Sequence, residues 1–166
     1  MTTSFRTFLT IISLFLAATN TYAQVDNTTI RQQVLKKGIT DSVFLFGKWT
    51  ESGKTETYLE YLGQFKTIHG QTFRIVNSTW IWGLSKRATS QILVFNDKNQ
   101  YVGSYFVGMV GDLPTSMQNG KLIFKNTDPD CDRNLITVID LKKGLPKRFF
   151  RKCKGEDGDL YYFGSE

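Results

Sequence analysis

Residues 72–110 constrain the fold of this chain more than any other stretch. They contain three β-prone runs and two of the three tryptophans, with turn-forming residues between the runs. The runs at 91–95 and 100–107 flank the turn sequence Asn96-Asp97-Lys98-Asn99, which predicts a β-hairpin. Gly103 and Gly108 predict bends or a close approach of two backbones. This stretch is therefore expected to be the centre of an antiparallel sheet.

The third run, at 72–82, predicts one long strand with a bend or bulge at Asn77-Ser78. Residues 83–89 are then a connection long enough to act as a lid or an arm. Before it, residues 58–67 also predict a strand, because the compact turn sequence at 68–71 allows them to fold back and pair with 72–82.

The rest of the chain repeats this pattern of short β-prone runs. Further strands are predicted at 42–49, 121–125, 135–140, 147–154 and 159–163, with a type I′ hairpin signal at Asn119-Gly120. The only convincing helix lies at 25–38, where Ile30, Val34 and Leu35 form an apolar stripe. Because no second helix separates the strands, a parallel βαβ architecture is not expected. The sequence predicts an all-β fold: an antiparallel meander of about eight to ten strands with one short N-terminal helix, closed as a barrel or split into a two-layer sandwich.

The first 23 residues predict export. Arg6 precedes the apolar run FLTIISLFLAA at 8–18, which has the length of a signal peptide and is too short to span a bilayer. Thr21 and Ala23 are small residues at the two positions before the cleavage site that a signal peptidase recognises. We therefore expect a signal peptide at 1–23 cleaved after Ala23, a helix and linker at 24–40, and a single β domain at 41–166. The mature chain, without a transmembrane segment, would be secreted or periplasmic.

Export changes the interpretation of the two cysteines. In an oxidising compartment, Cys131 and Cys153 are expected to form a disulfide. A hairpin in which Asp140 opposes Gly144 would place the two cysteines directly opposite each other, and would pair Leu135 with Phe149.

Two acidic segments would meet at the open end of that hairpin. Alternating carboxylates are the ligands that calcium prefers, so a calcium site is one interpretation, although the segment fails the EF-hand pattern at Arg133 and Ile139. The alternative is that these residues are turn formers in solvated loops. The candidate ligands are Asp128, Asp130, Asp132, Glu156, Asp157 and Asp159.

The formal net charge of +6 is modest, and no run of five like charges occurs. An exported chain with this charge is not expected to bind nucleic acid. Basic side chains do gather near the C-terminus, at Lys142, Lys143, Lys147, Arg148, Arg151, Lys152 and Lys154. They indicate either a patch for anionic glycan or a membrane surface, or an ordinary solvated strand pair with its apolar side turned inward.

The sequence offers little for catalysis. His69 is the only histidine, and the chain has no nucleophile elbow, HExxH motif, P-loop or dinucleotide fingerprint. No catalytic residue and no cofactor is assigned, and the expectation is a protein that is not an enzyme. A hydrolase that uses a carboxylate pair is the remaining alternative, because carboxylate spacing is a three-dimensional property.

Gly47-Lys48-Trp49 closes the first predicted strand after the N-terminal helix. In this respect the chain resembles the lipocalin-like (calycin-type) β-barrel families, which carry a G-x-W on their first strand. The resemblance implies that Trp49 closes the base of a barrel beneath a ligand cavity. It also implies that an arginine from a late strand packs across the ring, for which Arg151 is the candidate.

These observations together predict an exported, non-catalytic protein that binds an apolar or amphipathic small molecule. The candidate cavity wall is aromatic: Trp49, Trp80, Trp82, Tyr101 and Tyr105. By the two-residue period of a strand, Trp80 and Trp82 share one face, and Tyr101 and Tyr105 share another. Packing in an ordinary core is the alternative role for each ring. The alternative function is a surface module that binds glycan or a protein partner.

Overall fold

The computed structural model describes residues 27–165 and has two antiparallel sheets and one α-helix. The larger sheet contains, in spatial order, β1 (Val43–Gly47), β2 (Glu56–Lys66), β3 (Thr72–Trp82), β4 (Arg87–Asn96), β5 (Tyr101–Gly108), β10 (Asp157–Gly164) and β9 (Arg148–Lys154). The smaller sheet contains β6 (Ser116–Gln118), β7 (Lys121–Lys125) and β8 (Ile136–Asp140). The all-β antiparallel prediction is confirmed. Of its two versions the sandwich is the correct one, because the larger sheet is open, with β1 and β9 at its edges.

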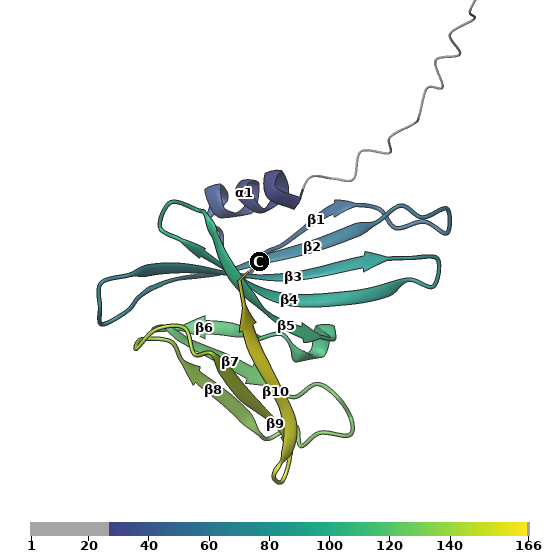
Figure 1. Cartoon of the computed structure of the whole chain (residues 1–166). Coiled ribbons are helices and arrows are strands. Elements are labelled where there is room, and N and C mark those ends of the chain that lie inside the picture. The colour runs from purple at the N-terminus through teal and green to yellow at the C-terminus, as the bar shows by residue number, and fades with distance from the viewer. Residues whose placement is uncertain (1–26, 166) are drawn as a thin grey trace, which may run out of the picture.

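The elements form three layers (Figure 1), with helix α1 (Asn27–Lys37) on one face of the larger sheet and the smaller sheet on the other. Under the helix, Val34 and Leu35 pack with Val76 and Leu93 of the sheet, and all four are buried. The predicted helix and its apolar stripe are therefore confirmed. The signal peptide predicted at 1–23 lies outside the described residues.

The core between the two sheets is rich in aromatic side chains. Phe149 of β9 lies at its centre, with ring centroids 5.0 Å from Tyr105, 5.4 Å from Phe124 and 5.4 Å from Tyr161. These four rings come from β9, β5, β7 and β10, so a single cluster joins strands of both sheets. Rings at these separations and tilts attract each other beyond their contribution to area burial.

The hairpins that were predicted from local turn sequences are confirmed. β2 pairs with β3 around the turn at 68–71, and β4 pairs with β5 around the turn at 96–99. Asn119 and Gly120 both have positive φ, 50° and 74°, as a type I′ turn between β6 and β7 requires.

Two details of the meander differ from prediction. β3 runs regularly through Asn77 and Ser78, and the bulge lies instead on its partner β2, between Tyr61 and Gly63. The segment predicted as a lid or arm is a short turn, because β3 continues to Trp82 and β4 already begins at Arg87. Trp82 and Arg87 are register partners, so the pairing of β3 with β4 continues up to this turn.

The disulfide prediction is confirmed, but the hairpin predicted around it is wrong. Cys131 and Cys153 are bonded, with Cα atoms 4.6 Å apart. However, β8 pairs with β7, and β9 pairs with β10, so Leu135 is not a register partner of Phe149. β9 and β10 are separated only by Gly155 and Glu156, and this short connection favours local pairing over the longer 141–147 connection. The disulfide therefore attaches the 126–135 loop to β9, where the Asp132 amide also donates to the Cys153 carbonyl at 2.8 Å.

Candidate functional site

The structure does not gather the five predicted wall residues around one cavity. On β5, the register shifts between the pairs Gly103–Val94 and Tyr101–Phe95, so one extra residue stands between them. This bulge places Tyr101 and Tyr105 on opposite faces of the sheet, and their predicted shared face is wrong. Tyr105 lies in the core between the sheets and donates to the Pro146 carbonyl at 2.7 Å. Tyr101 is 37% exposed and packs edge-on against Phe95, which belongs to the core under the helix.

The close backbone approach predicted at Gly103 is confirmed. A Cβ atom added at this position would lie 2.5 Å from the backbone oxygen of Gly164 in the neighbouring strand. No side chain fits there, so glycine is required for β5 and β10 to pair at this point.

Trp80 and Trp82 share a face, as predicted. Their rings are stacked, with centroids 5.5 Å apart and an interplanar angle of 20°. By the two-residue period of β3 this is also the face of Val76, which packs under the helix. The tryptophan pair therefore lies on the face of the larger sheet that is turned away from the smaller sheet. The Trp82 indole N–H donates to Thr89 Oγ1 at 2.9 Å, which fixes that ring on the sheet surface.

Trp49 and Arg151 have separate partners. The Trp49 indole N–H donates to the Gly83 carbonyl at 2.9 Å, and the cation over its ring is Lys86, with Nζ 5.4 Å from the centroid. Arg151 instead directs its guanidinium to Asp112 and Gly111. Trp49 thus fastens the β1–β2 connection to the turn between β3 and β4.

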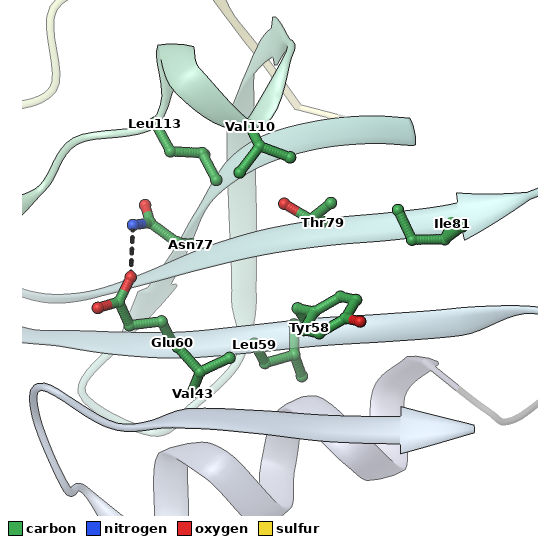
Figure 2. A pocket seen from close by; sticks show the side chains of 9 residues that line it. All are labelled: Val43, Tyr58, Leu59, Glu60, Asn77, Thr79, Ile81, Val110 and Leu113. Atoms are coloured by element: carbon green, nitrogen blue, oxygen red, sulfur yellow. Dashed lines mark hydrogen bonds between the residues drawn. The ribbon is translucent and has the colours of Figure 1, made fainter. Parts of the chain in front are cut away.

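A pocket of about 330 Å³ lies elsewhere, on the face of β1–β3 that is turned away from the helix (Figure 2). The neighbouring strands β2 and β3 supply most of its floor, and the segment around the 3₁₀ turn η1 (Val110–Asp112) supplies its roof. Its lining residues are Val43, Tyr58, Leu59, Glu60, Asn77, Thr79, Ile81, Val110 and Leu113.

The pocket exists because β2 and β3 are longer than the smaller sheet that covers them. Phe65, Phe73 and Ile75 at one end of these strands are part of the core between the sheets. At the other end, Tyr58 and Ile81 line the pocket instead. The uncovered half of the same face is therefore a concave, mainly apolar surface, the kind of site in which proteins hold small molecules.

Asn77 is the buried polar group of this pocket, with 4% of its surface exposed. Its Nδ2 donates to Glu60 Oε2 at 3.0 Å and to the Pro114 carbonyl at 2.9 Å. Because both amide hydrogens have acceptors, the orientation of the amide is fixed. Its Oδ1 is buried and accepts no hydrogen bond from any of residues 27–165. Asn77 therefore joins the floor to the roof and holds the Glu60 carboxylate in place.

Tyr58, at the rim, is fixed by Glu56. The Tyr58 hydroxyl donates to the Glu56 carboxylate, which also accepts the Trp49 amide at 3.2 Å. These two hydrogen bonds favour the ionised carboxylate and lower the pKa of Glu56. The hydrogen bond between Tyr58 and Glu56 also raises the pKa of the Tyr58 hydroxyl. The ring is thereby held across one side of the opening.

The roof is attached to β9 by a buried ion pair. Arg151, with 3% of its side chain exposed, donates to Asp112 Oδ1 at 2.7 Å and to the Gly111 carbonyl at 3.0 Å. Burial raises the pKa of Asp112, and the charge of Arg151 opposes that shift. Arg151 was predicted as part of a basic patch, but it faces inward and positions the segment that carries Val110 and Leu113.

The six acidic residues predicted as calcium ligands are not brought into one site. Asp128 Oδ1 and Asp132 Oδ1 accept backbone amides two residues further on, at 2.8 and 2.9 Å, which is the role of a turn former. Glu156 pairs with Lys152 at 3.2 Å. Within residues 27–165, no three His, Cys, Asp or Glu side chains lie close enough together to hold a metal ion.

Sequence reasoning missed the residues that form this pocket. Glu60 and Asn77 each interrupt an apolar run, and that interruption was the available signal. Asn77 instead belongs to a predicted bend or bulge, and Glu60 falls within the strand predicted at 58–67. Val110 and Leu113 had no signal, because nothing local shows that the segment following β5 returns over β3.

In the part of the chain that the structure describes, no helix is long and apolar enough to cross a membrane. Comparison with known proteins adds no further constraint: no family model matches the chain, and neither curated proteins nor solved structures give a significant match.

Proposed function

We propose that this chain is an exported, non-catalytic binding protein that holds one small apolar or amphipathic molecule in the pocket between β1–β3 and η1. The observation that carries the proposal is the pocket itself, which has a mainly apolar lining and a polar pair, Glu60 and Asn77. The resemblance of Gly47-Lys48-Trp49 to lipocalin-like proteins implies the same class of function. The disulfide is in keeping with an exported chain.

The volume limits the ligand. Pockets for small molecules commonly measure roughly 300 to 1,000 Å³, so a pocket of about 330 Å³ suits one small molecule. Burying about 200 Å² of apolar ligand surface would contribute about 5 kcal/mol, and because association also costs entropy, this burial alone supports a dissociation constant no lower than about 0.1 mM. The expected ligand is therefore compact and is held by moderate affinity.

Val110→Trp is expected to abolish this binding. Val110 lines the pocket and is 56% exposed, so a larger side chain can be accommodated without repacking the core and will occupy the opening. Isothermal titration of the disulfide-bonded chain with eight-carbon alcohols and small aromatic compounds would identify a bound probe. We expect the variant to weaken its binding at least about tenfold.

The matched control is Val138→Trp. Val138 is 50% exposed on β8 and lies outside the pocket, so this variant should bind as the unmodified chain does. The proposal is contradicted if none of the probes binds, or if the two tryptophan variants bind equally well.

A further inference from the structure

The pocket is lined by one charged side chain, Glu60, and no cationic side chain among the described residues pairs with it. Glu60 takes part in no ion pair among residues 27–165. No lysine, arginine or histidine lines the pocket. The other polar lining groups are the Tyr58 and Thr79 hydroxyls and the Asn77 amide, and the Thr79 hydroxyl is already engaged with Ser90 Oγ at 3.2 Å. The pocket therefore presents a negative charge within apolar walls.

The Glu60 carboxylate is held in a fixed position. Asn77 Nδ2 donates to Oε2 of Glu60, and the Asn77 amide is itself fixed by the Pro114 carbonyl. Figure 2 shows the carboxylate at one end of the pocket, with one oxygen turned to Asn77 and the other directed outward, away from the other labelled side chains. A carboxylate has about four acceptor positions, so one hydrogen bond from Asn77 leaves most of its capacity for a ligand.

The same wall holds a second acceptor. Asn77 Oδ1 is buried and accepts no hydrogen bond from the described residues. In Figure 2 it points toward the side of Leu113. A buried acceptor without a donor costs free energy, so a ligand that supplies an N–H there is favoured over one that does not.

We propose that the ligand is a hydrophobic amine, with its ammonium group on Glu60 and its apolar body against Tyr58, Ile81 and Val110. This inference rests on the proposed function, because it assigns the ligand class of the same pocket. An ammonium group supplies three N–H donors and one positive charge, which complements a wall made of acceptors and one carboxylate. An anionic amphiphile of the same size is disfavoured by repulsion from Glu60.

Three straight-chain probes test the inference: octylamine, 1-octanol and octanoate, titrated calorimetrically into the disulfide-bonded chain near neutral pH. An alkylamine is protonated there, as the lysine side chain is. Octylamine is expected to bind at least about tenfold more tightly than 1-octanol, because charge-assisted hydrogen bonds are the stronger kind, and octanoate is expected to bind most weakly.

Glu60→Gln is the deciding variant. Its amide oxygen can still accept from Asn77, so the pocket keeps its shape and loses its charge. We expect the preference for octylamine over 1-octanol to disappear, while the affinity for 1-octanol stays within about twofold. Glu156→Gln is the control, since Glu156 is exposed, is not a lining residue and already pairs with Lys152.

The outcomes separate this inference from the proposed function. If 1-octanol or octanoate binds the unmodified chain as tightly as octylamine, or if Glu60→Gln keeps the preference, the ligand is not an amine. Sensitivity of that binding to Val110→Trp would then leave the proposed function intact. If none of the three probes binds, both are overturned.

Discussion

Asp112→Asn is expected to lower the free energy of unfolding by about 1 to 2 kcal/mol, because the loss of the counter-charge of Arg151 is partly offset by removal of the burial cost that raises the pKa of Asp112. The asparagine keeps the shape of the side chain and removes its charge, so the guanidinium of Arg151 stays buried, 3% exposed, without a counter-charge. Removing one partner of a buried pair is more costly than removing an exposed pair, because the remaining charge stays out of water. Urea denaturation, followed by circular dichroism, measures the change.

Glu156→Gln is the matched control for this variant. It removes the carboxylate of the pair with Lys152, where the two side chains are 42% and 93% exposed, and it should leave the denaturation midpoint unchanged. Equal effects of the two substitutions would show that the pair between Arg151 and Asp112 does not hold the fold.

Removing the other partner should make stability depend on pH. In Arg151→Met, Asp112 loses the charge that opposes its raised pKa, so the pKa of its carboxyl rises further above the ordinary value of 3.8. The folded chain then binds a proton more tightly than the unfolded chain does. Stability is therefore retained at low pH and is lost as the pH rises through the folded-state pKa. The variant should be less destabilised at pH 4 than at pH 7.5, and a loss that is independent of pH would contradict this.

Phe149→Ala is expected to cost about 4 kcal/mol, because it removes the ring at the centre of the core between the sheets. Phe149 is 6% exposed, and its contacts with Tyr105, Phe124 and Tyr161 join both sheets. Alanine leaves a cavity among rings that are themselves anchored. The same denaturation experiment measures the loss.

The neighbouring residue gives the control for this substitution. Phe150 points to the other side of β9 and is 39% exposed, so Phe150→Ala should cost about 1 kcal/mol or less. If the two alanine variants are equally destabilised, this aromatic cluster is not the main contact between the sheets.

The sequence was sufficient for the elements whose signals are local. The apolar stripe of the helix, the turn at 68–71 and the Asn119-Gly120 turn each depend on neighbouring residues, and each is present in the structure. The disulfide was also predictable, because its prediction rests on the expected export and on the number of cysteines and does not require the correct strand register.

Strand faces and distant pairings could not be predicted in the same way. The bulge on β5 adds one residue, and one residue is enough to send Tyr101 and Tyr105 to opposite faces. Likewise, the choice of β9 to pair with β10 depends on the competition between two connections, which no local pattern reveals.

The pocket was the least predictable feature, because its residues come from segments between positions 43 and 113. The aromatic residues predicted to form the cavity wall instead pack in the cores, stack on the sheet surface or attach a loop. The residues that line the pocket are mostly aliphatic and carry no sequence signature. Only the two polar interruptions, Glu60 and Asn77, mark its position along the chain.

Nuclear magnetic resonance would locate a bound ligand most directly. In a chain with labelled methyl groups and indole nitrogens, addition of octylamine should shift the methyl signals of Val43, Ile81, Val110 and Leu113. The indole signals of Trp49, Trp80 and Trp82 should stay unchanged, because the tryptophan pair lies on the other face of the sheet and Trp49 is not a lining residue. Shifts confined to the indole signals would contradict the account and would place the binding site on the tryptophan face.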